Sequence, residues 1–109
     1  MKIANLDARA VPVLGDQVAD IATASDGRFG PDPMALYEDW DAFTAFAAGV
    51  TGGTGPLDEA KLANPAPRPR QVFAIGLNYR SHAEESGMAI PEVPAPFTKP
   101  PASLTGPFD

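Results

Sequence analysis

One segment of the chain combines residue types that could carry out acid–base chemistry. It runs Gly76-Leu77-Asn78-Tyr79-Arg80-Ser81-His82-Ala83-Glu84-Glu85 and contains the only histidine of the protein. Asn78 is a candidate helix N-cap and Gly87 a candidate helix end. His82 and Glu85 would then stand at i and i+3 of one short helix and share a face. A carboxylate beside an imidazole orients the ring, and such a pair can take a proton from water as a general base.

Spacing alone leaves a second interpretation of these residues open. A histidine next to a glutamate on a surface helix is most often simply solvated. Lys99 presents the same choice, because it follows the short extended segment Ala95-Pro96-Phe97-Thr98 and could meet an anionic ligand or only water. The site residues that the sequence offers are therefore His82, Glu85 and Lys99, and it offers no set of metal ligands.

The elements that must position these residues begin with an apolar run directly before the segment. Val72-Phe73-Ala74-Ile75 predicts a buried strand over residues 71–75. Alternating prolines stiffen the stretch before this strand and indicate a linker at residues 66–70. We therefore expect a first domain at residues 1–65 and a second region at residues 71–109.

The first 65 residues predict short antiparallel strands and one amphipathic helix. Strands are expected at residues 2–6, 10–14 and 17–21, with Pro12 favouring an edge position for the second. Asp32 and Pro33 suit the start of a helix over residues 32–49. Its apolar stripe consists of Leu36, Trp40, Phe43 and Ala47. The acidic residues between them indicate a solvated face rather than a metal cluster, and the fold class is α+β.

Composition narrows the range of functions. The chain has 109 residues, no cysteine and a net charge of −6, and residues 1–65 hold ten acidic but only four basic side chains. An acidic face argues against nucleic acid as a partner. No segment has the length or apolarity of a membrane span or a signal sequence, so a cytoplasmic protein is expected. Thr51-Gly52-Gly53-Thr54-Gly55 lacks the lysine of a phosphate-binding loop and indicates a flexible connector.

The His-containing segment resembles the entry into the catalytic domain of the fumarylacetoacetate hydrolase family. The resemblance runs from Phe73 through Met88 and continues over Pro94-Ala95-Pro96-Phe97-Thr98-Lys99-Pro100-Pro101-Ala102-Ser103-Leu104 to Gly106-Pro107. Residues 1–70 are similar, more weakly, to the small N-terminal domain of that family. The resemblance implies that residues 71–109 are the first strand and His-containing turn of a β-rich catalytic domain, and that they form only part of it.

The resemblance also implies an activity. Members hydrolyse or otherwise cleave 1,3-dicarbonyl and 2-oxo acids such as acylpyruvates, decarboxylate oxaloacetate, or isomerise oxo acids of aromatic breakdown. A Mg²⁺ or Mn²⁺ ion chelates the 2-oxo carboxylate. The family's histidine and glutamate correspond to His82 and Glu85, which would position and deprotonate water. Its lysine corresponds to Lys99, which would neutralise charge on the substrate. Such enzymes are commonly homodimers.

One departure from the family pattern bears on activity. The family's metal ligands are a Glu-x-Glu pair and an aspartate further along the chain, and residues 1–109 contain no Glu-x-Glu. We therefore expect no tight metal binding by this chain, and no activity from it alone. Three interpretations remain: part of a metal-dependent hydrolase or lyase, a non-catalytic module that folds through its N-terminal domain and binds a partner, and a nucleotide-binding module that uses residues 52–55.

Overall fold

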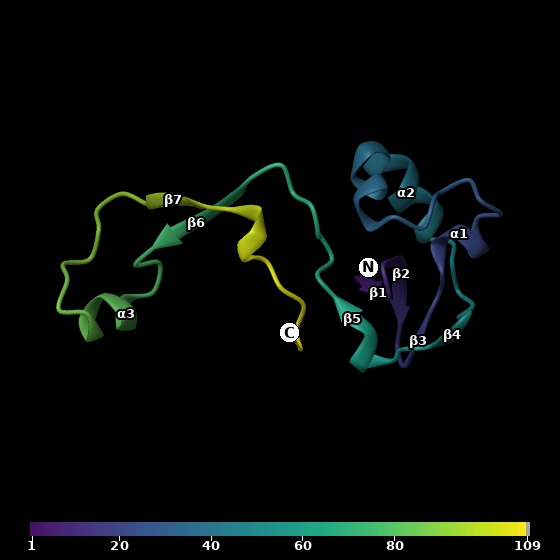
Figure 1. Ribbon diagram of the computed structural model, residues 1–109, viewed down its shortest axis with the longest axis horizontal. Helices are drawn as coiled ribbons and strands as arrows, with labels where there is room; N and C mark the ends of the chain where they lie inside the picture. The colour runs from purple at the N-terminus through teal and green to yellow at the C-terminus, as the bar shows by residue number, and fades with distance from the viewer. Residues whose placement is uncertain (109) are drawn as a thin grey trace. The chain divides into compact units, whose positions relative to one another are not determined.

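Five short antiparallel strands form the sheet of the first unit of the chain. The computed structural model describes residues 1–108, and this unit comprises Met1–Arg68 together with the residues from Leu104 onward. The strands follow the order β4-β3-β2-β1-β5 across the sheet. They are β1 (Ile3–Leu6), β2 (Arg9–Leu14), β3 (Gln17–Val18), β4 (Gly55–Pro56) and β5 (Leu62–Ala63). The α+β class expected from the sequence is confirmed (Figure 1).

Two tight turns set the register of the first three strands. Leu6 pairs with Arg9, so Asp7 and Ala8 form a two-residue loop, and both have positive φ, at 54° and 62°. Positive φ at both positions is the pattern of a type I′ turn, whose twist matches that of the strands. The β2–β3 loop has positive φ only at Gly15, its first residue, which is the pattern of a type II′ turn.

Two strand predictions are wrong in detail. The strand that contains Pro12 is not at an edge, because β2 lies between β1 and β3. Pro12 lies one position beyond the last β2–β3 ladder pair, Val13 with Val18, and its carbonyl accepts the N–H of Ala19. The third strand ends at Val18, since Asp20 caps a new helix that Ile21 begins.

Three helical segments cover one face of this sheet. They are α1 (Ile21–Ala24), the 3₁₀ helix η1 (Pro33–Asp39) and α2 (Trp40–Ala47). The single helix expected over residues 32–49 is thus divided in two. Asp39 adopts φ −136° and ψ 64°, outside the helical region, and its carboxylate accepts the N–H of Ala42 as the N-cap of α2. Asp32 caps η1 as predicted, through the N–H of Met34.

The core lies between these helices and the sheet. Its buried members are Ala10, Ile21, Leu36, Phe43 and Ala47. The ring of Phe29 packs edge-on against that of Phe43, with ring centroids 5.9 Å apart. Three of the four residues of the predicted apolar stripe are among them. The fourth, Trp40, is 41% exposed and stacks on Tyr37, with ring centroids 5.5 Å apart. The apolar stripe is therefore interrupted at Trp40, which lies outside the core at the junction between η1 and α2.

The end of the glycine-rich stretch, Thr54-Gly55, bonds to β3 and the start of α1, a connection that the prediction of a flexible connector at residues 51–55 did not include. The N–H of Thr54 donates to the carbonyl of Val18, and the Thr54 hydroxyl accepts the N–H of Asp20. Gly55 then pairs with Val18 in β4. A short 3₁₀ helix, η2 (Glu59–Lys61), leads from β4 to β5.

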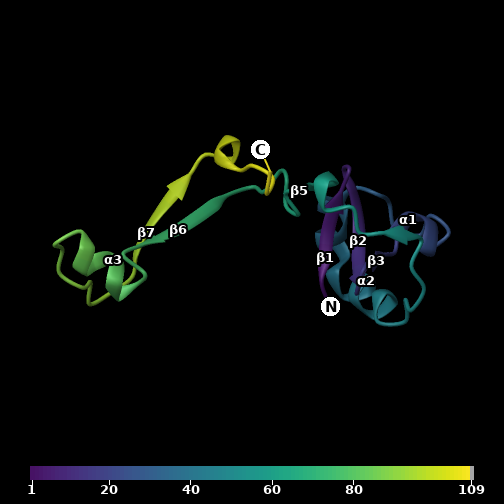
Figure 2. The same cartoon turned by 90° about the horizontal axis from the view of Figure 1, so that it is seen from below.

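The second unit, Pro69–Ser103, is a long hairpin with a helix at its tip (Figures 1 and 2). Strand β6 (Val72–Gly76) pairs antiparallel with β7 (Ala95–Lys99) over five residue pairs, from Val72 with Lys99 to Gly76 with Ala95. The excursion between the strands carries α3 (Arg80–Glu85), and the 3₁₀ helix η3 (Pro101–Ser103) follows β7. The strand expected over residues 71–75 exists, shifted by one residue.

This strand is not buried, contrary to the sequence-based expectation. Phe73 is 69% exposed, and it shares a face of the hairpin with Ile75. The opposite face presents Phe97, which stands across from Ala74. An uninterrupted apolar run is typical of a strand covered on both faces. Residues 1–108 cover neither face of β6–β7 completely, which explains why the prediction failed.

Candidate functional site

Helix α3 carries the two residues that the sequence singles out for acid–base chemistry. Its N-cap is Tyr79, whose side chain makes no capping hydrogen bond, so the prediction that Asn78 caps the helix is wrong. The predicted end at Gly87 is correct, and Gly87 has φ 64°. The N–H of Gly87 donates to the carbonyl of Glu84, and that of Met88 to Ala83. These two bonds make a Schellman motif, which fixes the last turn of the helix.

His82 and Glu85 face each other across one turn of this helix. The Nδ1 atom of His82 lies 4.0 Å from Oε2 of Glu85. This separation is too long for a direct hydrogen bond but short enough for a Coulombic pair or for one bridging water. Both side chains are open to solvent, at 63% and 78% exposure. The pair is therefore accessible to a ligand, and a small rotamer change would bring the two groups into contact.

Lys99 lies at the other end of the hairpin. It pairs with Val72 in the first rung, whereas α3 follows Gly76 in the last rung. Four residues of extended chain separate these rungs by roughly 13 Å along the strand. The described structure thus brings His82 and Glu85 together but leaves Lys99, which is exposed, at a distance from them.

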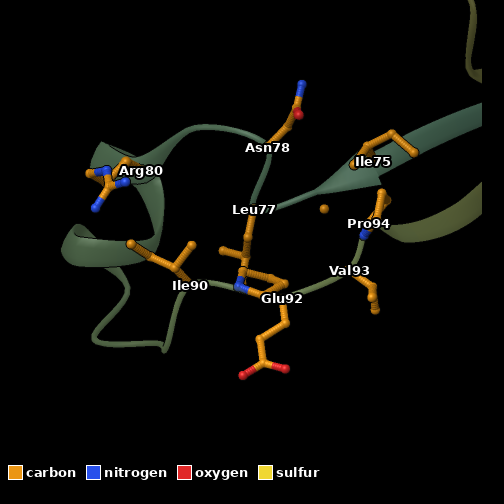
Figure 3. A pocket seen from close by; sticks show the side chains of 10 residues that line it. Ile75, Leu77, Asn78, Arg80, Ile90, Glu92, Val93 and Pro94 are labelled. Carbon is orange, nitrogen blue, oxygen red and sulfur yellow. The ribbon is translucent and has the colours of Figure 1, made fainter.

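A cavity of about 350 Å³ lies beside α3 at the tip of the hairpin (Figure 3). Its walls come from the β6–α3 loop, with Leu77, Asn78 and Arg80, and from residues 90–94 before β7. The close-up shows the Asn78 amide and the Glu92 carboxylate pointing in opposite directions from the backbone. The polar ends do not converge, so the cavity is not a preformed polar site. Neither His82 nor Glu85 lines it.

Leu77 is a backbone outlier in the wall of this cavity. Its φ is 48°, in the left-handed region that bulky residues rarely adopt. Such conformations cost about 1–3 kcal/mol and concentrate at functional sites. The strain turns the chain sharply between the end of β6 and the start of α3. No residue pattern in the sequence announces it, since leucine does not favour positive φ.

The described residues do not suit a resident metal ion. Among residues 1–108, no three His, Cys, Asp or Glu side chains come close enough to form a metal-binding group. Glu84 and Glu85 are adjacent on α3, so their carboxylates diverge. The divalent ion implied by the family resemblance finds no ligand set in this part of the chain.

The shortest ion pair among the described residues joins Arg9 and Asp20 in the first unit. Arg9 donates two hydrogen bonds to Asp20, at 2.5 and 2.9 Å, and Asp20 also caps α1 by accepting the N–H and hydroxyl of Thr23. The Arg9 hydrogen bond, reinforced by the Thr23 contacts, holds the pKa of Asp20 well below its usual range. The pair joins the start of β2 to α1. Sequence reasoning missed it, because nothing in the local pattern links these residues.

Comparisons with known proteins bear on this arrangement. No family model matches the chain. Oxaloacetate tautomerase YisK of Bacillus subtilis is 49% identical over 53 residues, which are 46% of this chain and 18% of YisK. The fumarylacetoacetate hydrolase domain-containing protein 2 homolog of Dictyostelium discoideum is 41% identical over 54 residues, 50% of this chain and 17% of that protein. The human mitochondrial oxaloacetate tautomerase FAHD2A is 35% identical over 54 residues, which are 50% of this chain and 17% of that protein.

A solved structure matches nearly the whole chain. The crystal structure of a Mycobacterium smegmatis protein described as HpcE aligns with a TM-score of 0.80 and 51% identity, over 98% of this chain and 38% of that one. The chain spans less than a fifth of the length of the curated relatives named above. No helix in residues 1–108 has the length and apolarity needed to cross a membrane.

The described chain is an α+β unit followed by a hairpin whose helix exposes an imidazole–carboxylate pair. The relatives and the solved structure relate this arrangement to a known family. These similarities support a relationship of the chain to the fumarylacetoacetate hydrolase family, although the chain spans less than two fifths of each matched protein.

Proposed function

We propose that this chain supplies the proton-transfer residues of an enzyme that acts on a small 2-oxo acid. The observation that carries the proposal is the exposed pair of His82 and Glu85, 4.0 Å apart on α3. The names of the relatives support the substrate class, since two of those described above, YisK and FAHD2A, are oxaloacetate tautomerases. Lys99, at the opposite end of the hairpin from α3, is proposed as a contact for a substrate carboxylate in the family-length enzyme.

The proposed reaction requires only one proton transfer from the pair of His82 and Glu85. Tautomerisation of oxaloacetate moves one proton between C3 and the oxygen on C2, with no change in the carbon skeleton. His82 would accept or deliver that proton, and Glu85 would orient the ring and favour its protonated form. Hydrolysis of an acylpyruvate would use the same pair differently, because His82 would take the proton of a water that attacks the distal carbonyl. Tautomerisation has the support of the relatives' names.

The exposure of the pair suggests that residues 1–109 need a covering surface to act. In bulk water an imidazole and a carboxylate at this distance influence each other weakly, and the same groups interact far more strongly when water is excluded. We therefore propose that the pair acts within a longer, family-length enzyme, in which a divalent ion such as Mg²⁺ or Mn²⁺ would be held by residues outside this chain. A homodimer and a cytoplasmic location belong to the same proposal.

A chimera tests the proposal directly. Residues 1–109 would replace the matching segment of the Mycobacterium smegmatis protein, whose structure covers nearly all of this chain at 51% identity. The chimera would be assayed with oxaloacetate, following the absorbance of the enol, and with an acylpyruvate. We expect His82→Gln to lower kcat/KM by roughly 10²–10⁴-fold on the active substrate, the usual contribution of a general base.

The control is built into the sequence. Glu84 and Glu85 are neighbours of the same type on one exposed helix, but only Glu85 lies across from His82. Glu85→Gln should lower kcat/KM, and Glu84→Gln should leave it within about twofold. An active chimera that keeps its rate after His82→Gln would overturn the proposed role of the pair. Equal losses from Glu84→Gln and Glu85→Gln would count against the role of Glu85.

A second candidate is a non-catalytic module that docks on a partner. The observation in its favour is the apolar hairpin, with Phe73 and Phe97 exposed on opposite faces of β6–β7. The two proposals differ in one measurement. If the chimera is inactive on both substrates although it folds, the module is favoured. If the 109-residue chain alone turns over either substrate with Mg²⁺, and His82→Ala abolishes the turnover, both the module and the need for a covering surface are wrong.

A further inference from the structure

The connector that follows β5 is held by three residues of the first unit, one in β1 and two in η1 or at its N-cap. The buried amide of Asn5, in β1, donates to the carbonyl of Asn64 at 2.7 Å. The hydroxyl of Tyr37, in η1, reaches the carbonyl of Pro65 at 3.4 Å. Arg68 donates to the carboxylate of Asp32 at 2.6 Å. Anchors therefore occur at the start and at the end of a five-residue stretch, residues 64–68, which we call the strap.

These anchors differ in strength. Asn5 is only 3% exposed, so breaking its bond would leave a buried donor unsatisfied. The Arg68–Asp32 bond is charge-assisted, but its side chains are 63% and 47% exposed, which makes it sensitive to salt. The Tyr37 contact is long for a hydrogen bond between oxygens and adds less. The ion pair is thus the element that fixes the far end of the strap.

The strap is also stiff by composition, which lowers the entropy lost when it is ordered. Pro65 and Pro67 each lock one φ angle within the strap, and Pro69 does so directly after it. The side chain of Asn64 accepts the N–H of Ala66 at 2.8 Å, closing a turn at the start of the strap. Few conformations therefore compete with the anchored one. A single ion pair can then be enough to hold the last residue.

We propose that residues 64–68 are a strap docked on the first unit, with the Arg68–Asp32 ion pair as its clasp, rather than a free tether. Pro69, Arg70 and Gln71 are then the only residues between the last anchored position and β6. This goes beyond the acid–base chemistry of α3 and does not depend on it. According to this proposal, the ordered part of the first unit extends beyond the sheet and ends at Arg68.

Backbone ¹⁵N relaxation on the intact chain tests the strap. The amides of Asn64, Ala66 and Arg68 report on it, since its prolines have none. In the unaltered chain we expect order parameters near 0.85 at these positions, as in the sheet, and a fall at Arg70. In Arg68→Gln, the value at position 68 should drop below about 0.6 while Asn64, held by Asn5, stays near 0.85. About 1 M NaCl should weaken the clasp in the same direction.

Arg70→Gln is the matched control. Arg70 also follows a proline of the connector and is exposed, but no ion pair to it occurs in the described residues. This variant should leave the order of the strap unchanged. Asp32→Asn should reproduce the effect of Arg68→Gln, and the sheet amides would verify that each variant is folded. An order parameter below about 0.6 at Arg68 in the unaltered chain, or equal effects of Arg68→Gln and Arg70→Gln, would overturn the proposal.

Discussion

His82 Nδ1 lies 4.0 Å from Glu85 Oε2 on a helix of only six residues, Arg80–Glu85. A helix this short has little stability of its own in water. Its last turn is held by the Schellman bonds that Gly87 and Met88 make to Glu84 and Ala83. Because Glu85 lies in that last turn, the geometry of the pair depends on the helix end.

The first prediction concerns Gly87. Its φ of 64° suits glycine, and a Cβ there would meet no atom within 4 Å, so a substitution is opposed by backbone conformation rather than by a clash. Gly87→Ala should cost the local helix about 1 kcal/mol and unwind its last turn. Loss of helical ¹³Cα shifts at Glu84 and Glu85 would show this. Gly76→Ala is the control, since its φ is ordinary and the shifts should persist.

The second prediction concerns the Asp20 network. Asp20→Ala removes the N-cap of α1 and the partner of Arg9, and should lower the free energy of unfolding by about 2 kcal/mol near pH 7. Asp16→Asn, in an exposed turn, should change it by less than about 0.5 kcal/mol. Urea titrations followed by circular dichroism would measure both. Equal effects of the two substitutions would refute the role given to Asp20.

The same network predicts a pH dependence. The folded-state pKa of Asp20 is depressed, mainly by the hydrogen bond from Arg9, so folding favours the ionised carboxylate. Its stabilisation is complete above the unfolded-state pKa of about 4 and is lost as the pH falls through and below that value. The difference in unfolding free energy between the unaltered chain and Asp20→Asn should therefore shrink between pH 5 and about pH 2. If the difference in unfolding free energy stayed constant over this pH range, the stabilising role of the ionised Asp20 carboxylate would be contradicted.

The third prediction concerns the turn between β1 and β2. Ala8 has φ 62°, which costs a residue with a Cβ about 1–2 kcal/mol. Ala8→Gly would create an Asp-Gly pair, a favoured type I′ sequence, and should raise the unfolding free energy by about 1 kcal/mol. Ala8→Val, which is β-branched, should lower it. Thermal denaturation of the three proteins gives the order, and a less stable Ala8→Gly would exclude the turn type assigned here.

These cases show which features could be read from the sequence. The caps at Asp32 and Gly87, and the shared face of His82 and Glu85, are local and follow from helix geometry, so they were predictable. Several of the failures involve partners outside the local sequence pattern. Thr54 is ordered by Val18 and Asp20, and Pro12 is accommodated by Ala19, which no local pattern reveals.

The same contrast between local and non-local features applies to the candidate site. The i, i+3 spacing was enough to bring the pair together, because a helix turn does so by itself. The distance of Lys99 from α3 depends on the hairpin register, with Lys99 opposite Val72, and the cavity wall depends on the strained backbone of Leu77. The register is set by pairing between residues some twenty or more apart, and neither it nor the Leu77 conformation could be derived from residue types.

The last prediction contrasts two phenylalanines on the two units. Phe43 is completely buried among the helices, so Phe43→Ala should lower the unfolding free energy of the first unit by about 3–5 kcal/mol. Phe73, 69% exposed on β6, contributes little to folding but adds to an apolar face that favours self-association. Phe73→Thr should therefore leave unfolding of the first unit unchanged and raise the concentration at which the protein aggregates, as seen by light scattering. Val93 is as exposed as Phe73 but lies outside the strands, so Val93→Thr should change neither quantity. If Val93→Thr suppressed aggregation as well as Phe73→Thr does, general surface apolarity rather than the strand face would drive association.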